Sequence, residues 1–203
     1  MKAVIAVISD LSTDMRVQKH AMFLAGEGNE VMLIGRETGS RLPLALPGVD
    51  AVRIRVPFRK GPCMYILFNF LLFWRLLFRR FDLCLACDLD TLVPCYMITR
   101  LSGRRLVYDA HEYFTGQQGL AERRVKHAIW KCAERLILPK VRHMITVSDS
   151  IADLYHREYG VAPVVIRNVA LSVTHLEPHD RSALGASEEE MLVVFQGSGI
   201  NEG

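Results

Sequence analysis

The segment Tyr108–Phe114 holds the highest density of chemically active side chains in the sequence. It places His111 between two carboxylates, Asp109 and Glu112. A neutral imidazole in such a place can donate to or accept from a sugar hydroxyl, while a neighbouring carboxylate fixes its tautomer. A zinc protease motif of the H-E-x-x-H type would need a second histidine where Thr115 stands, so that motif is absent. The alternative for His111 is a loop histidine that only hydrogen-bonds locally.

A second motif, Asp88-Leu89-Asp90, has the D-x-D form with which many nucleotide-sugar enzymes hold a divalent cation. It also stands where an expected strand ends and a helix begins. Asp90 or Thr91 is then explained as the helix N-cap and Asp88 as a turn residue. We favour capping over a metal site and expect no metal.

A third polar stretch is the turn Ser9–Arg16, which leads into a helix. It lacks the G-x-G-x-x-G pattern that lets a backbone approach a pyrophosphate, which disfavours dinucleotide binding. Hydroxyls and free N–H groups at such a turn can meet sugar hydroxyls or a phosphate. The alternative is that Asp14 serves only as an N-cap.

The elements that position these residues follow from the apolar pattern, in which β-rich runs alternate with segments of helical period. The expected strands cover residues 3–8, 30–35, 51–56, 82–87, 105–109, 143–147 and 163–167. The expected helices cover residues 14–26, 63–80, 91–101, 120–138 and 149–158. This order predicts an α/β fold with a Rossmann-like, doubly wound parallel sheet. Such sheets bind ligands beyond the carboxyl ends of their strands, where all three motifs stand.

The composition is that of a folded domain, and it argues against a disordered chain and against a nucleic-acid-binding protein. Of 203 residues 50% are hydrophobic, which excludes a disordered chain, and the net charge of +3 is too small to indicate a nucleic-acid binder. Five cysteines without a recognisable secretory signal favour a reducing cytoplasm. Cys84 and Cys87 stand in an apolar strand, where alternation sends their side chains to opposite faces. We therefore expect them to pack in the core.

The expected helix at 63–80 is apolar nearly all round, yet too short and too interrupted to span a bilayer. It includes Trp74, and residues 51–105 around it hold ten basic and three acidic residues. Basic pairs flank the helix at both ends: Arg59 with Lys60, and Arg79 with Arg80. This combination fits docking to an anionic membrane surface. A helix covered by the sheet and its neighbours is the equal alternative.

The pattern of apolar and polar residues changes after the last expected strand. Residues 169–190 have no clear period and read as a connector. Residues 191–197 form a fresh apolar strand with a Gly-Ser-Gly turn, which favours the start of a second domain over a last strand of the first sheet. We therefore expect domains at 1–168 and 191–203, joined by the connector.

Six segments match a known family in order. They are Ser9-Asp10-x-x-x-Asp14-x-Arg16-Val17, Gly28-Asn29-Glu30-Val31, Asp88-Leu89-Asp90-Thr91-Leu92, Tyr108-Asp109-Ala110-His111-Glu112, Ile145-Thr146-Val147-Ser148-Asp149-Ser150-Ile151-Ala152 and Val165-Ile166-Arg167-Asn168-Val169. Together they resemble the N-terminal, acceptor-side domain of the GT-B glycosyltransferases, in family 4 of the retaining nucleotide-sugar enzymes.

The resemblance implies two Rossmann-like domains, with the nucleotide-sugar donor held mainly by the second and the acceptor by the first, and no metal or other cofactor. His111 stands at the family's histidine that reaches the transferred sugar, and Gly197 at the glycine loop that opens the donor domain. The expected acceptor or substrate contacts are Ser9, Asp10, Asp14, Arg16, Asp88 and Glu112. Because the sequence stops soon after Gly197, we expect the 203-residue chain alone to be inactive.

These observations predict a cytoplasmic glycosyltransferase, peripheral on the inner face of the membrane, that acts on a lipid-linked or polysaccharide acceptor. Its expected partners are a nucleotide-sugar donor, the glycan or lipid-linked acceptor and an anionic membrane surface, without nucleic acid. One alternative is a non-catalytic partner subunit that binds the acceptor. A less favoured one is a GT-B-type nucleotide-sugar epimerase.

Overall fold

A computed structural model of the chain describes residues 1–39, 44, 46–117, 119–120, 123–169, 185, 187 and 189–193. The chain divides into two compact units, Met1–Asn168 and Val169–Gly203. The described residues of the second unit hold no helix or strand. Gly197 and most of the expected strand 191–197 lie outside the described residues, so the connector and the second domain stay predictions.

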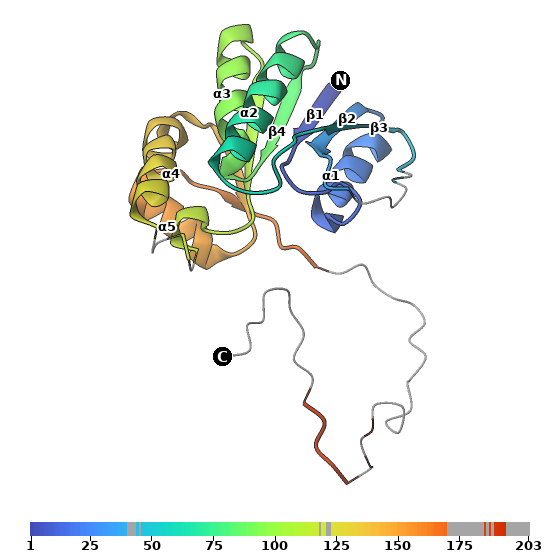
Figure 1. Ribbon diagram of the computed structural model, residues 1–203, viewed down its shortest axis with the longest axis vertical. Helices are drawn as coiled ribbons and strands as arrows, with labels where there is room; N and C mark the ends of the chain where they lie inside the picture. Colours follow the sequence, from blue (N-terminus) through green and yellow to red (C-terminus); the bar gives the residue numbers. More distant parts are fainter. Residues whose placement is uncertain are drawn as a thin grey trace. The chain divides into compact units, whose positions relative to one another are not determined.

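The first unit is built on a seven-stranded sheet whose paired strands are all parallel, in the order β3-β2-β1-β4-β5-β6-β7. The strands are β1 Lys2–Ala6, β2 Glu30–Arg36, β3 Val49–Ile54, β4 Leu83–Cys87, β5 Arg105–Ala110, β6 His143–Thr146 and β7 Val164–Val165. Strand order runs outward in both directions from β1 (Figure 1). The predicted doubly wound parallel sheet is confirmed, with β7 shorter than expected.

In the described part of the chain, five α-helices and two short 3₁₀ turns connect the strands. They are α1 Met15–Gly26, α2 Pro62–Leu77, α3 Leu89–Ser102, η1 Phe114–Gly116, α4 Arg124–Ile137, η2 Leu138–Lys140 and α5 Asp149–Tyr159. Two of the helices begin at side-chain caps, because Asp14 accepts from the N–H of Val17 and Ser148 from that of Ile151. The capping alternative for Asp14 is therefore confirmed as a local contact.

The sheet is buried on both faces, as parallel sheets require. One apolar cluster joins Val4 of β1 to buried residues of α2, α3 and α5, and the other joins Ile5 of β1 to α1. Cys84 belongs to the first cluster and Cys87 to the second, and both are free and fully buried. The prediction that these two cysteines pack on opposite faces of the sheet is confirmed.

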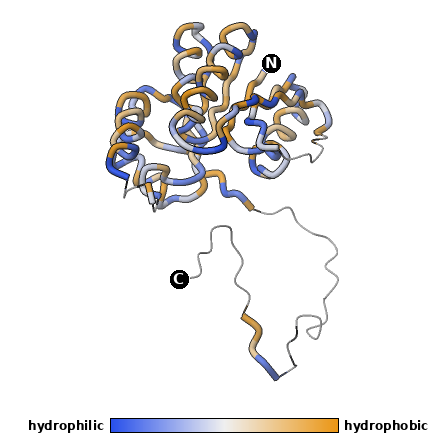
Figure 2. The backbone as a smooth tube through the Cα atoms, viewed as in Figure 1, coloured by the Kyte–Doolittle hydropathy of each residue, from blue (hydrophilic) through white to orange (hydrophobic). Residues whose placement is uncertain are grey.

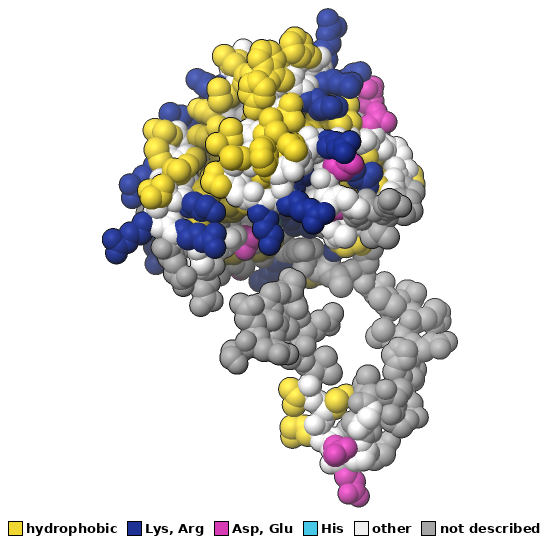
Figure 3. Space-filling view, in the orientation of Figure 1, with side chains coloured by type: hydrophobic (Ala, Val, Ile, Leu, Met, Phe, Trp, Pro, Cys, Tyr) yellow, Lys and Arg dark blue, Asp and Glu magenta, His cyan; other side chains and the backbone are white. Residues whose placement is uncertain are grey.

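Helix α2 is apolar on two sides, and hydrophobic colour dominates it in Figure 2. Every fourth residue is buried: Met64, Phe68, Leu72 and Leu76, of which the last three belong to the apolar cluster that includes Val4 of β1. The opposite side leaves large apolar residues exposed: Ile66, Phe70, Trp74, Leu77 and, just after the helix, Phe78. A helix wholly covered by the sheet and its neighbours is therefore excluded. In Figure 3 exposed hydrophobic side chains gather over α2 and α3, with Lys and Arg side chains around them.

Candidate functional site

The polar motifs meet where the sheet changes direction. Strand β1 lies between β2 and β4. The chain therefore leaves β1 toward β2 and leaves the neighbouring strand β4 toward β5, in opposite directions along the sheet. Such a switch point opens a crevice at the carboxyl edge of a parallel sheet. The turn that begins at Ser9, residue Asp88 after β4 and His111 after β5 all stand at this edge.

A buried arginine links these elements. Arg16, in the first turn of α1, is only 8% exposed. Its Nη1 donates to Oδ2 of Asp109 at 2.8 Å, and its Nη2 lies 3.5 Å from Oδ2 of Asp88. Burial alone would lower the pKa of Arg16, but the charges of Asp109 and the other acidic groups outweigh it and raise that pKa. The arginine therefore holds α1 against the ends of β4 and β5.

Asp88 has a strained backbone. Its φ of +64° is the one positive φ at a non-glycine residue in the part of the chain that the structure describes. Such conformations cost on the order of 1–3 kcal/mol and persist only where surrounding contacts hold them. Here the carboxylate lies between Arg16 and His111, with Oδ2 3.5 Å from Nη2 of Arg16 and Oδ1 2.6 Å from Nδ1 of His111. The strained backbone at Asp88 directs its carboxylate toward the His111 ring.

For the D-x-D motif, the prediction that Asp90 or Thr91 caps the helix is wrong, whereas Asp88 as a turn residue is confirmed. Helix α3 begins at Leu89, with Asp88 in the N-cap position, but the Asp88 side chain makes no capping hydrogen bond. The Thr91 hydroxyl donates to the carbonyl of Cys87 instead. Sequence spacing placed the helix start two residues too late, because the chain turns at the strained Asp88 and not at Asp90.

The two carboxyls of the motif lie in different surroundings. Asp90 is 7% exposed, and its Oδ1 has no hydrogen-bond partner among the described residues. Burial, together with the charge of Asp88, raises the pKa of Asp90 well above its ordinary value. Within the described residues no three His, Cys, Asp or Glu side chains are grouped as metal ligands. The absence of a metal requirement stays a prediction.

His111 is partly exposed and electrostatically biased toward its charged form. Burial alone would lower the pKa of its imidazole. The adjacent Asp88 carboxylate outweighs this and, with Glu112, raises the pKa above its ordinary value. Nδ1 faces Asp88, while Nε2 lies 3.5 Å from Oε1 of Glu112. The ring can therefore act as a donor with a fixed orientation.

Four of the predicted site residues surround one hollow of about 390 Å³. Its lining is Ser9, Thr13, Asp14, Met15, Arg16, His111 and Asn168. The Ser9 hydroxyl donates to Asp14 at 2.6 Å, which fixes both side chains. The hollow thus presents a hydroxyl, a carboxylate, a guanidinium and an imidazole, a set that suits a polyhydroxylated or anionic ligand. Roles of single residues stay predictions.

Other predicted residues do not reach the hollow. Asp10 accepts from the Ser12 N–H at 2.8 Å and from the Thr38 hydroxyl, so it stabilises its own turn. Burial would raise the pKa of Asp10, but these hydrogen bonds outweigh it and lower that pKa. Asp88 contacts His111 without lining the hollow, and Glu112 lies beside the ring.

Sequence reasoning missed two members of the network. Asp109 was noted beside His111 but not chosen as a site residue, and His20 was not noted at all. Nε2 of His20 lies 3.1 Å from Oδ2 of Asp109. His20 follows Arg16 by four residues on the same helix face, so helical spacing from Arg16 was the available signal.

The family follows from a direct comparison. The model of Glycosyltransferase Family 4 matches residues 15–169. The chain belongs to glycosyltransferase family 4. No curated protein matches the sequence. The matched residues include Arg16, Asp88, Asp109 and His111, so the buried network lies within the family's domain.

Solved structures show that this family 4 domain has the GT-B type of fold. Sucrose-phosphate synthase from Thermosynechococcus elongatus superposes with a TM-score of 0.66 at 13% identity, over 82% of this chain and 47% of the other. The lipopolysaccharide outer core galactosyltransferase WaaB gives 0.56 at 11%, over 86% and 47%. Os79 from O. sativa in complex with UDP gives 0.56 at 11%, over 79% and 49%. The chain spans about half the length of each.

The pKa of His111 tests the electrostatics of this site. Replacing Asp88 by asparagine (Asp88→Asn) should lower that pKa below its ordinary value of about 6.5, because burial and Arg16 then dominate. NMR titration of the His111 ring, assigned with a His111→Gln variant, measures the shift.

Asp10→Asn is the matched control and should leave the His111 titration unchanged, since Asp10 contacts Ser12 and Thr38 instead. A raised folded-state pKa adds stability that is present below about pH 6.5 and is lost as pH rises through the folded value. The wild type should therefore exceed His111→Gln in stability by more at pH 5.5 than at pH 8.5. An unchanged His111 pKa in Asp88→Asn would contradict the assignment.

Proposed function

We propose that this chain forms the acceptor side of a retaining glycosyltransferase that moves a sugar from a nucleotide-sugar donor to a lipid-linked or polysaccharide acceptor. The observation that carries the proposal is His111, oriented by Asp88 at a hollow on the switch point of a family 4 domain. The chain spans about half the length of the solved enzymes above, so a second, donor-binding domain is part of the proposal.

The proposed reaction joins an acceptor oxygen to the anomeric carbon of the donor sugar. The bond between that carbon and the diphosphate oxygen breaks, the diphosphate leaves with the bonding pair, and the acceptor hydroxyl gives its proton to the departing diphosphate. A donor group that strengthens its contact as charge develops lowers the barrier. His111 suits this role toward a sugar hydroxyl, because Asp88 orients its ring and favours the protonated form.

A nucleoside diphosphate sugar is the donor class that the solved structures support. One of them, Os79 from O. sativa, is described in complex with UDP. That this chain's own donor is such a nucleotide sugar is part of the proposal. We place the donor mainly on the second domain, so that the hollow beside His111 receives the transferred sugar.

We also propose that the apolar side of α2 docks on an anionic membrane surface on the cytoplasmic side. None of the described helices is long and apolar enough to cross a bilayer. Phe70, Trp74 and Phe78 are exposed, and the Trp74 ring stacks on Phe78 with centroids 5.8 Å apart. All four flanking basic residues are exposed: Arg59, Lys60, Arg79 and Arg80. Aromatic rings and basic side chains in this arrangement suit a lipid interface.

Loss of the histidine should affect turnover far more than folding. In the complete enzyme, His111→Ala should lower kcat by about 10²–10³, the usual effect of removing one group that stabilises the transition state. The assay measures transfer of radiolabelled sugar from a panel of nucleotide sugars. His143→Ala, at the start of β6 and the opposite edge of the sheet, is the control and should keep full activity. A His111→Ala rate within threefold of wild type would contradict the proposed role.

Membrane docking should depend on charge. Vesicle sedimentation should show binding to anionic but not to zwitterionic lipid, and binding should weaken between roughly 50 and 500 mM salt as the Debye length shrinks. Replacing the four flanking residues by glutamine should abolish binding without unfolding the domain, because exposed charges add little stability. The control replaces four other exposed basic residues: Lys140, Arg142, Arg157 and Arg167. Equal loss in both variants, or no binding by wild type, would contradict docking through α2.

A further inference from the structure

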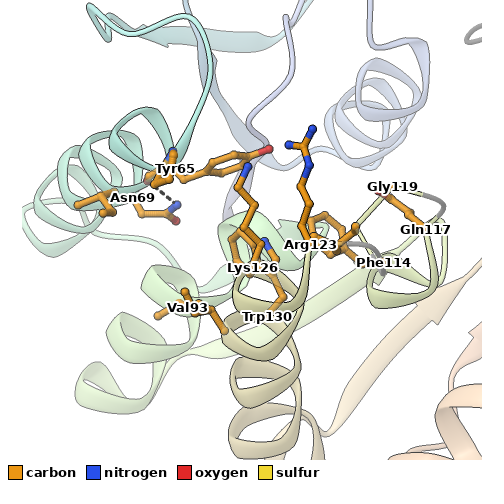
Figure 4. Close-up of a pocket in the computed structure, with 13 residues that line it drawn as sticks. Tyr65, Asn69, Val93, Phe114, Gln117, Gly119, Arg123, Lys126 and Trp130 are labelled. Carbon is orange, nitrogen blue, oxygen red and sulfur yellow. Dashed lines mark hydrogen bonds between the residues drawn. The ribbon is translucent and has the colours of Figure 1, made fainter.

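A second cavity lies on the face of the sheet that α2 and α3 cover, separate from the hollow beside His111. It is formed by α2, α3, the start of α4 and the loop after η1 (Figure 4). Its volume of about 610 Å³ falls in the range of small-molecule sites. Among the described residues, none lines both cavities. The sequence motifs do not predict this cavity.

The walls of the cavity are mainly apolar and aromatic. The Trp130 ring of α4 makes edge contacts with Tyr65 of α2 and Phe114 of η1, with centroids 5.6 and 5.4 Å apart. Val93 of α3 completes one side. Asn69 donates from Nδ2 to the Tyr65 carbonyl, so its amide is held in place. A slot of this kind suits an aliphatic chain better than a sugar.

Cations stand beside this apolar slot. Arg123 and Lys126 line it, and Figure 4 shows both side chains extending from the start of α4 toward Tyr65. No carboxylate occurs among the described lining residues. Neither cation has an ion pair or a side-chain hydrogen bond within the described part of the chain. The cavity therefore offers a ligand two positive charges that no described residue pairs with.

The sequence at the start of α4 also favours an anionic ligand in this cavity. Its first turn holds Arg124 and Lys126 and no acidic residue, and Arg123 at the N-cap makes no side-chain cap. Cations at a helix N-terminus oppose the helix dipole and cost stability. A bound anion would offset both the dipole and the mutual repulsion of these side chains. The charge pattern thus favours an anionic group at the cation-lined end of the slot.

The cavity also connects with the exposed apolar side of α2. Ile66 and Ile129 line it and are nevertheless 70% and 61% exposed. Ile66 stands one helical turn before Phe70 and two before Trp74, on the side proposed to meet the membrane. An aliphatic chain that leaves a bilayer at this face would therefore enter the slot along a continuous apolar surface.

We propose that this cavity binds the lipid phosphate of the acceptor: an aliphatic chain between Tyr65, Phe114 and Trp130, with its phosphate on Arg123 and Lys126. The inference rests on the proposed function in taking this lipid as the carrier of the acceptor sugar. Phe114, which forms one wall, follows His111 by three residues, so the proposed carrier site and the proposed reacting site are close in the sequence. Inorganic phosphate lacks the aliphatic chain that the proposed site requires, and a neutral surfactant lacks the negative charge.

Trp130 provides a direct reporter, because the chain has two tryptophans and the other, Trp74, can be replaced. In a Trp74→Phe background, decyl phosphate below its micelle concentration should change Trp130 fluorescence in a saturable manner. Decyl maltoside should bind at least tenfold more weakly, and inorganic phosphate at equal concentration should cause no change. Arg123→Gln with Lys126→Gln should weaken decyl phosphate binding at least tenfold.

Two further variants keep the test specific. Lys140→Gln with Arg142→Gln removes the same charge at exposed positions outside the cavity and should change the affinity by less than twofold. Val93→Phe narrows the slot without changing charge and should also weaken binding. Equal affinity for decyl phosphate and decyl maltoside, or no effect of replacing Arg123 and Lys126, would overturn the proposal.

A transfer assay separates this proposal from the proposed function. Sugar transfer by the complete enzyme that is unaffected by the Arg123 and Lys126 changes, with no decyl phosphate binding, would overturn the cavity assignment alone. Decyl phosphate binding with the predicted variant pattern, but no sugar transfer with any donor, would instead contradict the proposed function. Binding of intact anionic vesicles without binding of monomeric decyl phosphate would also overturn the cavity assignment.

Discussion

One buried guanidinium organises the carboxyl edge of this sheet. Arg16 is nearly inaccessible to water, and a buried charge is tolerated only where opposite charges and hydrogen bonds surround it. Its partners Asp109 and Asp88 come from the ends of two neighbouring strands. The pairing therefore holds α1, β4 and β5 in one arrangement. His111 takes its orientation from the same network through Asp88, so the candidate site depends on this arginine.

The fold could be predicted from sequence because its signals are local, whereas the site network could not. Apolar runs and their alternation located all seven strands and sent Cys84 and Cys87 to opposite faces. The partner of Arg16 depends instead on register, since the N–H of Asp88 donates to the carbonyl of Asp109 at 2.9 Å across two strands. The strained turn at Asp88 likewise follows from charges that are distant in sequence.

The same distinction applies to the apolar helix. Composition indicated an apolar segment with basic flanks, but only packing separates the side of α2 that meets the sheet, at Phe68, from the exposed side, at Phe70. The second cavity was invisible to sequence reasoning because Tyr65, Val93 and Trp130 come from three helices. Where these side chains come together, the exposed apolar side of α2, which we propose to meet the membrane, continues into the cavity proposed to bind the lipid acceptor.

A double-mutant cycle between Arg16→Met and Asp109→Asn tests the central claim most directly. Urea unfolding of the 203-residue chain would give the free energy of unfolding of each variant. Each single change should cost about 3–5 kcal/mol, because it leaves a buried charged or polar partner without compensation. The double variant should lose far less than the sum of the two. Additive losses, within about 0.5 kcal/mol, would show that the two side chains act independently and that Arg16 does not organise the site.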